Sequence, residues 1–438
     1  MKQSILSKDG VSYVVPFILI TSCFALWGFA NDITNPMVKA FSKIFRMSAT
    51  DGALVQVAFY GGYFAMAFPA AMFIRRYSYK AGVLVGLGLY ALGAFMFYPA
   101  KMTGEYYPFL IAYFILTCGL SFLETSSNPY ILSMGTEETA TRRLNLAQSF
   151  NPMGSLLGMY VAMNFIQAKL NPLDTASRAD LTPAEFEAVK EYDLSVLIGP
   201  YLVIGLVILA MFMLILFWRM PKNGDKNHNI DFVPTLRHIF AMPHYREGVI
   251  AQFFYVGVQI MCWTFIIQYG TRVLMADGMA EQAAEVTSQQ YNILAMIIFC
   301  CSRFICTFLL RYINTGRLLM VLSIVGGLLV VGVIGLQNIY GLYCLVGVSA
   351  CMSLMFPTIY GIALTGLGDD AKFGAAGLIM AILGGSVLPP LQAAIIDQVE
   401  LLGMPAVNVS FILPFVCFVV IAIYGHRTFL RSKGQLGG

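Results

Sequence analysis

Charged residues are scarce in this chain of 438 amino acids. Asp, Glu, Lys and Arg together make up 11% of it, whereas soluble domains carry about 25%. Hydrophobic residues make up 58%, and so much apolar surface cannot be enclosed in one water-soluble core. The composition therefore excludes an ordinary soluble protein and predicts the lipid bilayer as a partner. The small net charge of +4 gives no reason to expect a nucleic-acid partner.

The sequence also lacks the residue groups that metal sites and catalytic centres require. Its four histidines fall in or beside polar segments and form no cluster. Its nine cysteines lie within apolar stretches without zinc-ligand spacing, so we interpret them as small buried hydrophobic residues. No nucleophile stands with a general base, and we predict neither enzymatic activity nor a bound cofactor. No cleavable signal peptide is evident, because the apolar run after Lys8 has no small-residue cleavage site.

Long apolar runs dominate what remains. Runs of about 20 residues, the length needed to cross a bilayer, occur twelve times. They are continuous rather than alternating, which argues against a membrane β-barrel. The sequence therefore predicts an all-α membrane protein with twelve transmembrane helices. The predicted spans are residues 13–35, 51–74, 82–100, 107–133, 143–167, 194–218, 247–271, 287–310, 317–337, 339–366, 372–395 and 408–430.

Lys and Arg are distributed unevenly over the predicted loops. If both termini lie on one side, that side collects 18 of the 27 basic residues and the other side 8, with Arg303 left inside a span. By the positive-inside rule, both termini are expected to lie in the cytoplasm. The expected location of the protein is the inner membrane of the cell. On the outer side, Pro183–Lys190 is expected to form a short surface helix.

The two halves of the chain echo each other. Arg76-Tyr-Ser-Tyr-Lys80 between spans 2 and 3 corresponds to Arg311-Tyr-Ile-Asn-Thr-Gly-Arg317 between spans 8 and 9. Asn128-Pro129 in span 4 corresponds to Phe356-Pro357 in span 10. We predict two six-helix halves related by a pseudo-two-fold axis, the major facilitator fold, with a site near the midplane between them. The predicted domains are residues 1–220, a cytoplasmic linker 221–245, and residues 246–438.

Two carboxylates interrupt these apolar spans. Glu124 lies in span 4 and Asp32 near the end of span 1. A charge near the middle of a membrane costs about 2.5–3.5 kcal/mol, so such residues usually bind a proton, an ion or a polar substrate. The alternative is a carboxylate at a helix end that reaches the headgroups, which fits Asp32 better than Glu124. We predict that both take part in proton coupling.

Amides and aromatic residues within the spans are candidate ligands for a hydroxyl-rich substrate. Amides offer donors and acceptors together, and aromatic faces stack on the C–H face of sugars. Helical spacing puts Gln148 and Asn151 three apart in span 5, and Glu124 and Asn128 four apart in span 4. The alternative is that the amides join neighbouring helices and the aromatics fill the core. The candidates are Gln148, Asn151, Asn31, Asn35, Asn128, Gln252, Gln259, Trp27, Trp263 and Tyr360.

Two further residues have open roles. Arg303 in span 8 either pairs with a carboxylate in a central cavity or anchors the helix bundle. Asn145, close to Arg142 and Arg143, is expected to be structural.

Several motifs resemble the fucose:proton symporter family of the major facilitator superfamily over nearly the whole chain. They are Phe24-Ala-Leu-Trp-Gly-Phe-Ala-Asn, Ala58-Phe-Tyr-Gly-Gly-Tyr-Phe, Ser78-Tyr-Lys-Ala-Gly, Leu123-Glu-Thr-Ser-Ser-Asn-Pro, Arg143-Leu-Asn-Leu-Ala-Gln-Ser-Phe-Asn and Ala251-Gln-Phe-Phe-Tyr-Val-Gly-Val-Gln-Ile-Met-Cys-Trp. The resemblance implies that Glu124 is a proton-linked carboxylate and that Gln148 and Asn151 contact the sugar. This chain departs from the family in span 1. The family's carboxylate aligns with Asn35, whereas the acid of this chain is Asp32.

The resemblance implies a secondary transporter that takes up L-fucose with a proton by alternating access. A monosaccharide is then the substrate, and a monomer is expected. One alternative is a glucose or galactose transporter of the same family, with either a proton or sodium as the coupling ion. An alternative from another class, a sugar-sensing receptor without transport, needs a signalling domain that neither short terminus offers.

Overall fold

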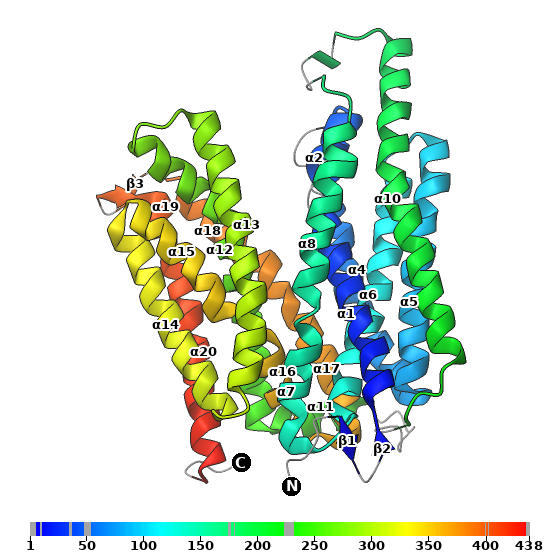
Figure 1. Cartoon of the computed structure of the whole chain (residues 1–438), viewed down its shortest axis with the longest axis vertical. Coiled ribbons are helices and arrows are strands. Elements are labelled where there is room, and N and C mark those ends of the chain that lie inside the picture. Colours follow the sequence, from blue (N-terminus) through cyan, green and yellow to red (C-terminus); the bar gives the residue numbers. More distant parts are fainter. Residues whose placement is uncertain are drawn as a thin grey trace. The chain divides into compact units, whose positions relative to one another are not determined.

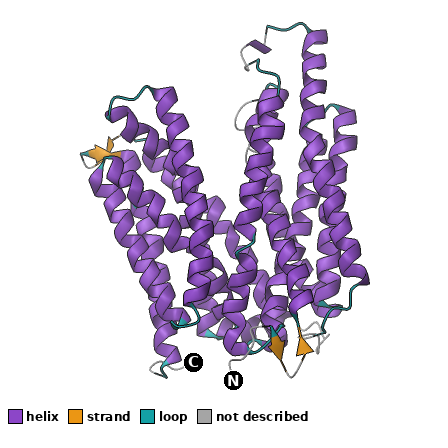
Figure 2. Cartoon of the chain, in the orientation of Figure 1, coloured by secondary structure: helices purple, strands orange, loops and turns teal. Residues whose placement is uncertain are grey.

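Helices make up nearly all of the protein in the computed structural model (Figures 1 and 2). The structure describes residues 6–8, 11–34, 37–47, 54–173, 177–178, 180–222, 232–398, 400–401 and 403–434. Contacts between residues divide the chain into two compact units. Unit 1 comprises Met1–Met134 and Phe150–Ile230, and unit 2 comprises Gly135–Ser149 and Asp231–Gly438. The predicted boundaries at residues 220 and 246 remain a prediction.

Unit 1 is a bundle of long helices. Helix α6 packs against both α4 and α5, α5 packs against α10, and α1 packs along α8. The short strands β1 (Ser7–Lys8) and β2 (Val11–Ser12) form an antiparallel pair before α1. The helices are α1 (Val14–Thr34), α2 (Met37–Ile44), α4 (Leu54–Arg76), α5 (Tyr79–Thr103), α6 (Tyr107–Ser133), α8 (Asn151–Val161) and α10 (Pro183–Phe217). After α8 the chain continues through a π turn, Ala162–Ile166, and a 3-10 turn, Gln167–Lys169.

Glycine lets α1 and α8 approach backbone to backbone. A Cβ atom on Gly154 of α8 would lie 1.8 Å from the carbonyl oxygen of Ala25 in α1. A Cβ atom on Gly28 of α1 would lie 2.1 Å from the carbonyl oxygen of Asn151. Small residues at such crossings are typical of membrane helix pairs, because close van der Waals packing replaces the hydrophobic effect there.

Unit 2 is a second helix bundle, in which α12 contacts most of the other long helices. Strands β3 (Glu400–Leu401) and β4 (Met404–Pro405) form an antiparallel pair. The helices are α7 (Ala140–Gln148), α11 (Phe232–Ala241), α12 (Pro243–Ala276), α13 (Glu281–Leu309), α14 (Thr315–Leu336), α15 (Ile339–Met352), α16 (Met355–Leu364), α17 (Ala371–Met380), α18 (Gly384–Ile396), α19 (Ala406–Val409) and α20 (Ile412–Ser432). Short 3-10 turns occur at Glu137–Thr139, Gly368–Asp370 and Ala381–Leu383.

Ten helical segments of the described chain are long and apolar enough to cross a membrane, as judged by length and composition. They coincide with ten of the twelve predicted spans. The predicted span 51–74 corresponds to α4, although residues 51–53 lie outside the described part of the chain. The expected short helix Pro183–Lys190 is not a separate element. It forms the first turns of α10, whose start is fixed by a capping box between Thr182 and Glu185.

The prediction of one continuous helix over residues 143–167 is wrong. Helix α7 ends at Gln148 and α8 begins at Asn151. Pro152 explains the break, because its ring clashes with the carbonyl four residues earlier and its nitrogen carries no hydrogen to donate. Span 10 breaks in the same way between α15 and α16, with Pro357 just beyond the break.

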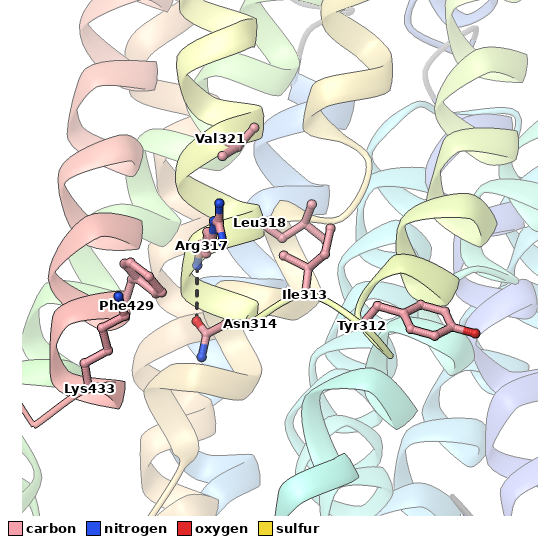
Figure 3. A pocket seen from close by; sticks show the side chains of 8 residues that line it. All are labelled: Tyr312, Ile313, Asn314, Arg317, Leu318, Val321, Phe429 and Lys433. Atoms are coloured by element: carbon pink, nitrogen blue, oxygen red, sulfur yellow. Dashed lines mark hydrogen bonds between the residues drawn. The ribbon is translucent and has the colours of Figure 1, made fainter.

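A hollow of about 470 Å³ opens at the start of α14 and the end of α20 (Figure 3). Arg317 and Lys433 line it together with the ring of Phe429. Asn314 caps α14 there, since its side chain accepts hydrogen bonds from the backbone amides of Gly316 and Arg317. None of the candidate binding residues lies in this hollow.

Candidate functional site

Glu124 is buried in the interior of unit 1, with 5% of its surface exposed. The hydroxyl of Tyr63 on α4 donates a hydrogen bond of 2.8 Å to its Oε1 atom. Tyr63 is itself buried. Among the residues that the structure describes, no Lys, Arg or His pairs with this carboxylate. Because a buried charge without a counter-ion is costly, the site favours a carboxyl group that can take up a proton.

One further polar contact joins α6 to α4 near Glu124. Ser121 donates a hydrogen bond of 3.2 Å to the carbonyl oxygen of Tyr63. Within α6, Asn128 donates a hydrogen bond of 3.0 Å to the backbone carbonyl oxygen of Glu124, and its predicted role in sugar binding remains a prediction. Thr125 and Ser127 are buried, and their hydroxyl groups have no partner within the described chain. Helix α6 therefore carries buried hydroxyl groups close in sequence to Glu124 that its described contacts do not satisfy.

Asp32 lies two residues before the end of α1 and is half-buried. Tyr60 on α4 lies within electrostatic range of its carboxylate. Tyr60 and Tyr63 are three residues apart on α4, so one helix carries a tyrosine near each of the two carboxylates. The neighbouring Asn31 is half-buried, and its Oδ1 atom has no partner among the described residues. Asn35 lies outside the described residues.

Trp27 packs within α1, and Asn151 joins α8 to α1. Trp27 is buried, with its ring centroid 4.0 Å from that of Phe24. The Asn151 amide donates a hydrogen bond of 3.1 Å to the carbonyl oxygen of Phe24. Both side chains therefore have structural contacts, and their predicted role in sugar binding remains a prediction.

Gln148 lies at the end of α7 in unit 2 and is 4% exposed. The expectation that Gln148 and Asn151 share one face of one helix is wrong, because the break before Pro152 separates them. Asn145 forms the interhelical contact that we expected of a structural amide. Its side chain donates a hydrogen bond of 3.1 Å to the hydroxyl oxygen of Thr358 on α16.

Helices α12 and α16 of unit 2 carry the remaining candidates. Gln252 is fully buried, and neither atom of its amide has a partner within the described chain. An unsatisfied buried amide is rare and is typical of a site that receives a ligand or water. Gln259 and Trp263 are half-buried, and the Trp263 indole donates a hydrogen bond of 3.2 Å to Ser349. Tyr360 is buried, with its ring centroid 6.1 Å from that of Phe356.

Tyr63 is the functional candidate that the sequence reasoning missed. It lies in the stretch Ala58-Phe-Tyr-Gly-Gly-Tyr-Phe, which carried the family resemblance but was assigned no role. Its place in that motif was its only signal, because tyrosine is common in this chain and a tyrosine in the sequence does not show which residue its hydroxyl group contacts. Within the described residues, no three His, Cys, Asp or Glu residues group to hold a metal ion.

Comparisons with known proteins agree on one kind of molecule. The profile of the Major Facilitator Superfamily matches residues 20–390. The chain is 51% identical to the L-fucose-proton symporter of Haemophilus influenzae, over 99% of this chain and 100% of that protein. It is 29% identical to a glucose/galactose transporter of Brucella abortus, over 93% of this chain and 92% of that protein.

A solved structure matches the whole fold. It is the crystal structure of FucP, a major facilitator superfamily transporter, in the outward conformation. The TM-score is 0.86 at 31% sequence identity, and the match covers 95% of this chain and 99% of that one.

Proposed function

Because the chain belongs to the major facilitator superfamily and, within it, to the fucose:proton symporter family, we propose that it takes up L-fucose together with a proton. The match at 51% identity supports fucose over glucose or galactose, for which the relative is 29% identical. The protein is a transporter and not an enzyme. It moves the sugar across the membrane by alternating access.

The observation that carries the coupling is the burial of Glu124 against Tyr63. The carboxylate has one described hydroxyl donor and no described cation beside it. Moving this helix bundle through its cycle with a charged Glu124 is costly, and a proton removes that cost. Sugar and proton are coupled if the protonated form is the one that carries the sugar across.

Asp32 is the second proton-linked group in this proposal. Its half-buried position near Tyr60 supports a role inside the bundle rather than at the headgroups. The proton is the coupling ion, and sodium is the rival. No cofactor is required.

The sugar is proposed to meet amide side chains whose hydrogen-bonding capacity is unfilled in the structure. Gln252, with both amide atoms unpartnered within the described chain, is the best supported of these, followed by Asn31. A hydroxyl-rich ring satisfies such groups, since each hydroxyl donates and accepts. The proposal retains Gln148, Asn151, Trp263 and Tyr360 as contacts.

The uneven placement of Lys and Arg supports cytoplasmic termini and a position in the inner membrane. A monomer is the proposed working unit, with one monosaccharide as its substrate.

Reconstitution into proteoliposomes tests the function directly. Labelled L-fucose, D-glucose and D-galactose are supplied in turn, under an imposed proton gradient or an imposed sodium gradient. We expect accumulation of L-fucose with the proton gradient alone. Preferential accumulation of glucose or galactose, or a requirement for sodium, would replace this proposal by its rival. Sugar binding without any accumulation would favour a sugar sensor.

A further inference from the structure

Arg303 is a buried cation on α13 that the proposed transport cycle does not use. It is 3% exposed, and a charge at such a depth in a membrane helix needs compensation. The ionisable groups close to it are Tyr255, Cys300 and Cys306. No carboxylate within the described residues forms an ion pair with it, so the expected pairing with an acid is not found there.

Two backbone carbonyls take the place of a counter-ion. The Nη1 atom donates a hydrogen bond of 3.0 Å to the carbonyl oxygen of Gln148, and the Nε atom donates to that of Ser353. Both acceptors stand four residues before a proline, Pro152 and Pro357 respectively. In a regular helix the amide four residues on would occupy each carbonyl, but proline has no N–H group. Each proline removes the amide that would bond the carbonyl in a regular helix, and Arg303 donates to both of these carbonyls.

The position of these carbonyls also neutralises the charge. Gln148 is the last residue of α7, and Ser353 caps the end of α15. Helix C-termini carry partial negative charge and favour a cation. The guanidinium carbon also lies 4.5 Å from the ring centroid of Phe299, whose face adds a cation–π contact.

The same contacts reach two of the candidate sugar ligands. Gln148 is held through its own carbonyl. Trp263 meets the other side of the network, with its ring centroid 4.9 Å from that of Phe299. We propose that Arg303 is a positioning residue, whose single guanidinium joins the proline-broken spans 5 and 10 and thereby fixes Gln148 and Trp263 for the sugar. The effect on sugar binding rests on the proposed function. The clamp, by which we mean the two hydrogen bonds from Arg303 to the carbonyls of Gln148 and Ser353, does not depend on it.

Kinetics of fucose transport test the positioning role. Arg303→Lys keeps the charge but replaces a planar fork by a single ammonium group, which cannot reach both carbonyls and stack on the ring. We expect Arg303→Lys and Arg303→Gln to raise KM about 10-fold, with a smaller change in the maximal rate. Arg237→Gln, which removes an exposed cation from α11 of the same unit, is the matched control and should leave KM unchanged. A wild-type KM for Arg303→Lys would overturn the proposal.

A double-mutant cycle tests the clamp without any sugar. Pro152→Ala restores an N–H group that can take the carbonyl of Gln148. We expect Arg303→Gln to lower the thermal midpoint of the purified protein by several degrees in the wild-type background and by clearly less in the Pro152→Ala background. Pro357→Ala should give the same result, and Pro200→Ala in α10 should leave the effect of Arg303→Gln unchanged. Additive effects in both proline backgrounds would overturn the clamp, even if the protein transports no sugar at all.

Discussion

At the scale of single residues, the hydrogen bond between Tyr63 and Glu124 is the contact with the clearest consequence for coupling. A hydrogen bond to a charged group contributes about 1.5–3 kcal/mol. Tyr63→Phe removes this donor and keeps the ring. We therefore expect proton-driven accumulation of fucose to fall several-fold and the pH midpoint of sugar exchange to move by about one unit or more.

Tyr90→Phe is the matched control for Tyr63→Phe. Tyr90 is equally buried in unit 1, but its hydroxyl donates to the carbonyl oxygen of Leu26 rather than to a carboxylate. It should leave the pH profile of exchange in place, even if it lowers stability. The same pH profile in both variants would mean that Tyr63 has a packing role.

Asp32 allows a second residue-level prediction. Asp32→Asn removes the charge near Tyr60 while keeping the size of the side chain, and we expect accumulation to fall at least 10-fold. Uptake measured across a range of pH checks this. Asn35→Ala, at the position where the family has its acid, should chiefly weaken sugar binding. Equal uptake by Asp32→Asn and the wild type would leave Glu124 as the single coupling carboxylate.

Sequence reasoning found acids more readily than their partners. Glu124 stands out because charge is rare in an apolar span, whereas Tyr63 is one of 23 tyrosines and gives no such contrast. The partners of Arg303 were hidden for another reason. They are backbone carbonyls, which every residue has, and only the helix breaks in the structure show which of them Arg303 reaches. The spacing of Gln148 to Pro152 and of Ser353 to Pro357 was nevertheless readable in the sequence.

At the scale of helices, the crossing of α1 and α8 depends on glycine. Gly154→Ala places a Cβ atom only 1.8 Å from the present position of the carbonyl oxygen of Ala25, which is far too close. The helices must separate, and overpacking of this kind costs about 1–3 kcal/mol. Thermal denaturation should show a clear loss of stability. Gly61→Ala in α4, where a Cβ atom meets nothing within 4 Å, should differ little from the wild type. Equal stability of the two variants would contradict the close crossing.

Helix positions were easier to predict than helix interruptions. An apolar run of about 20 residues is a property of the sequence alone, so the ten apolar helical segments coincide with predicted spans. The break at Ser149–Phe150 depends on a competition between Pro152 and the surrounding packing, which a run of hydrophobic residues does not reveal. Pro129 shows why, since it lies within the uninterrupted helix α6.

At the scale of the whole molecule, coupling means that sugar and proton enter together. Addition of L-fucose to proteoliposomes in weakly buffered medium should raise the external pH as protons enter. Glu124→Gln mimics the neutral acid, so exchange of labelled for unlabelled fucose should survive while this proton entry and net accumulation are lost. Glu247→Gln is the control, because the Glu247 carboxylate, at the start of α12, already forms ion pairs with Arg427 and Arg431 of α20. Wild-type proton entry in Glu124→Gln would remove Glu124 from the coupling role.

The assignment of Gly135–Ser149 to unit 2 has a consequence for biosynthesis. Helix α7 packs against α13 and α16, which leave the ribosome long after it does. Contacts between segments so far apart in the chain form late, because a long loop must close first. While the intervening helices are translated, the side chain of Asn145 and the backbone carbonyl of Gln148 therefore do not yet have their final partners, Thr358 and Arg303. Until α13 and α16 are made, we expect this stretch to be accessible to a chaperone or a protease.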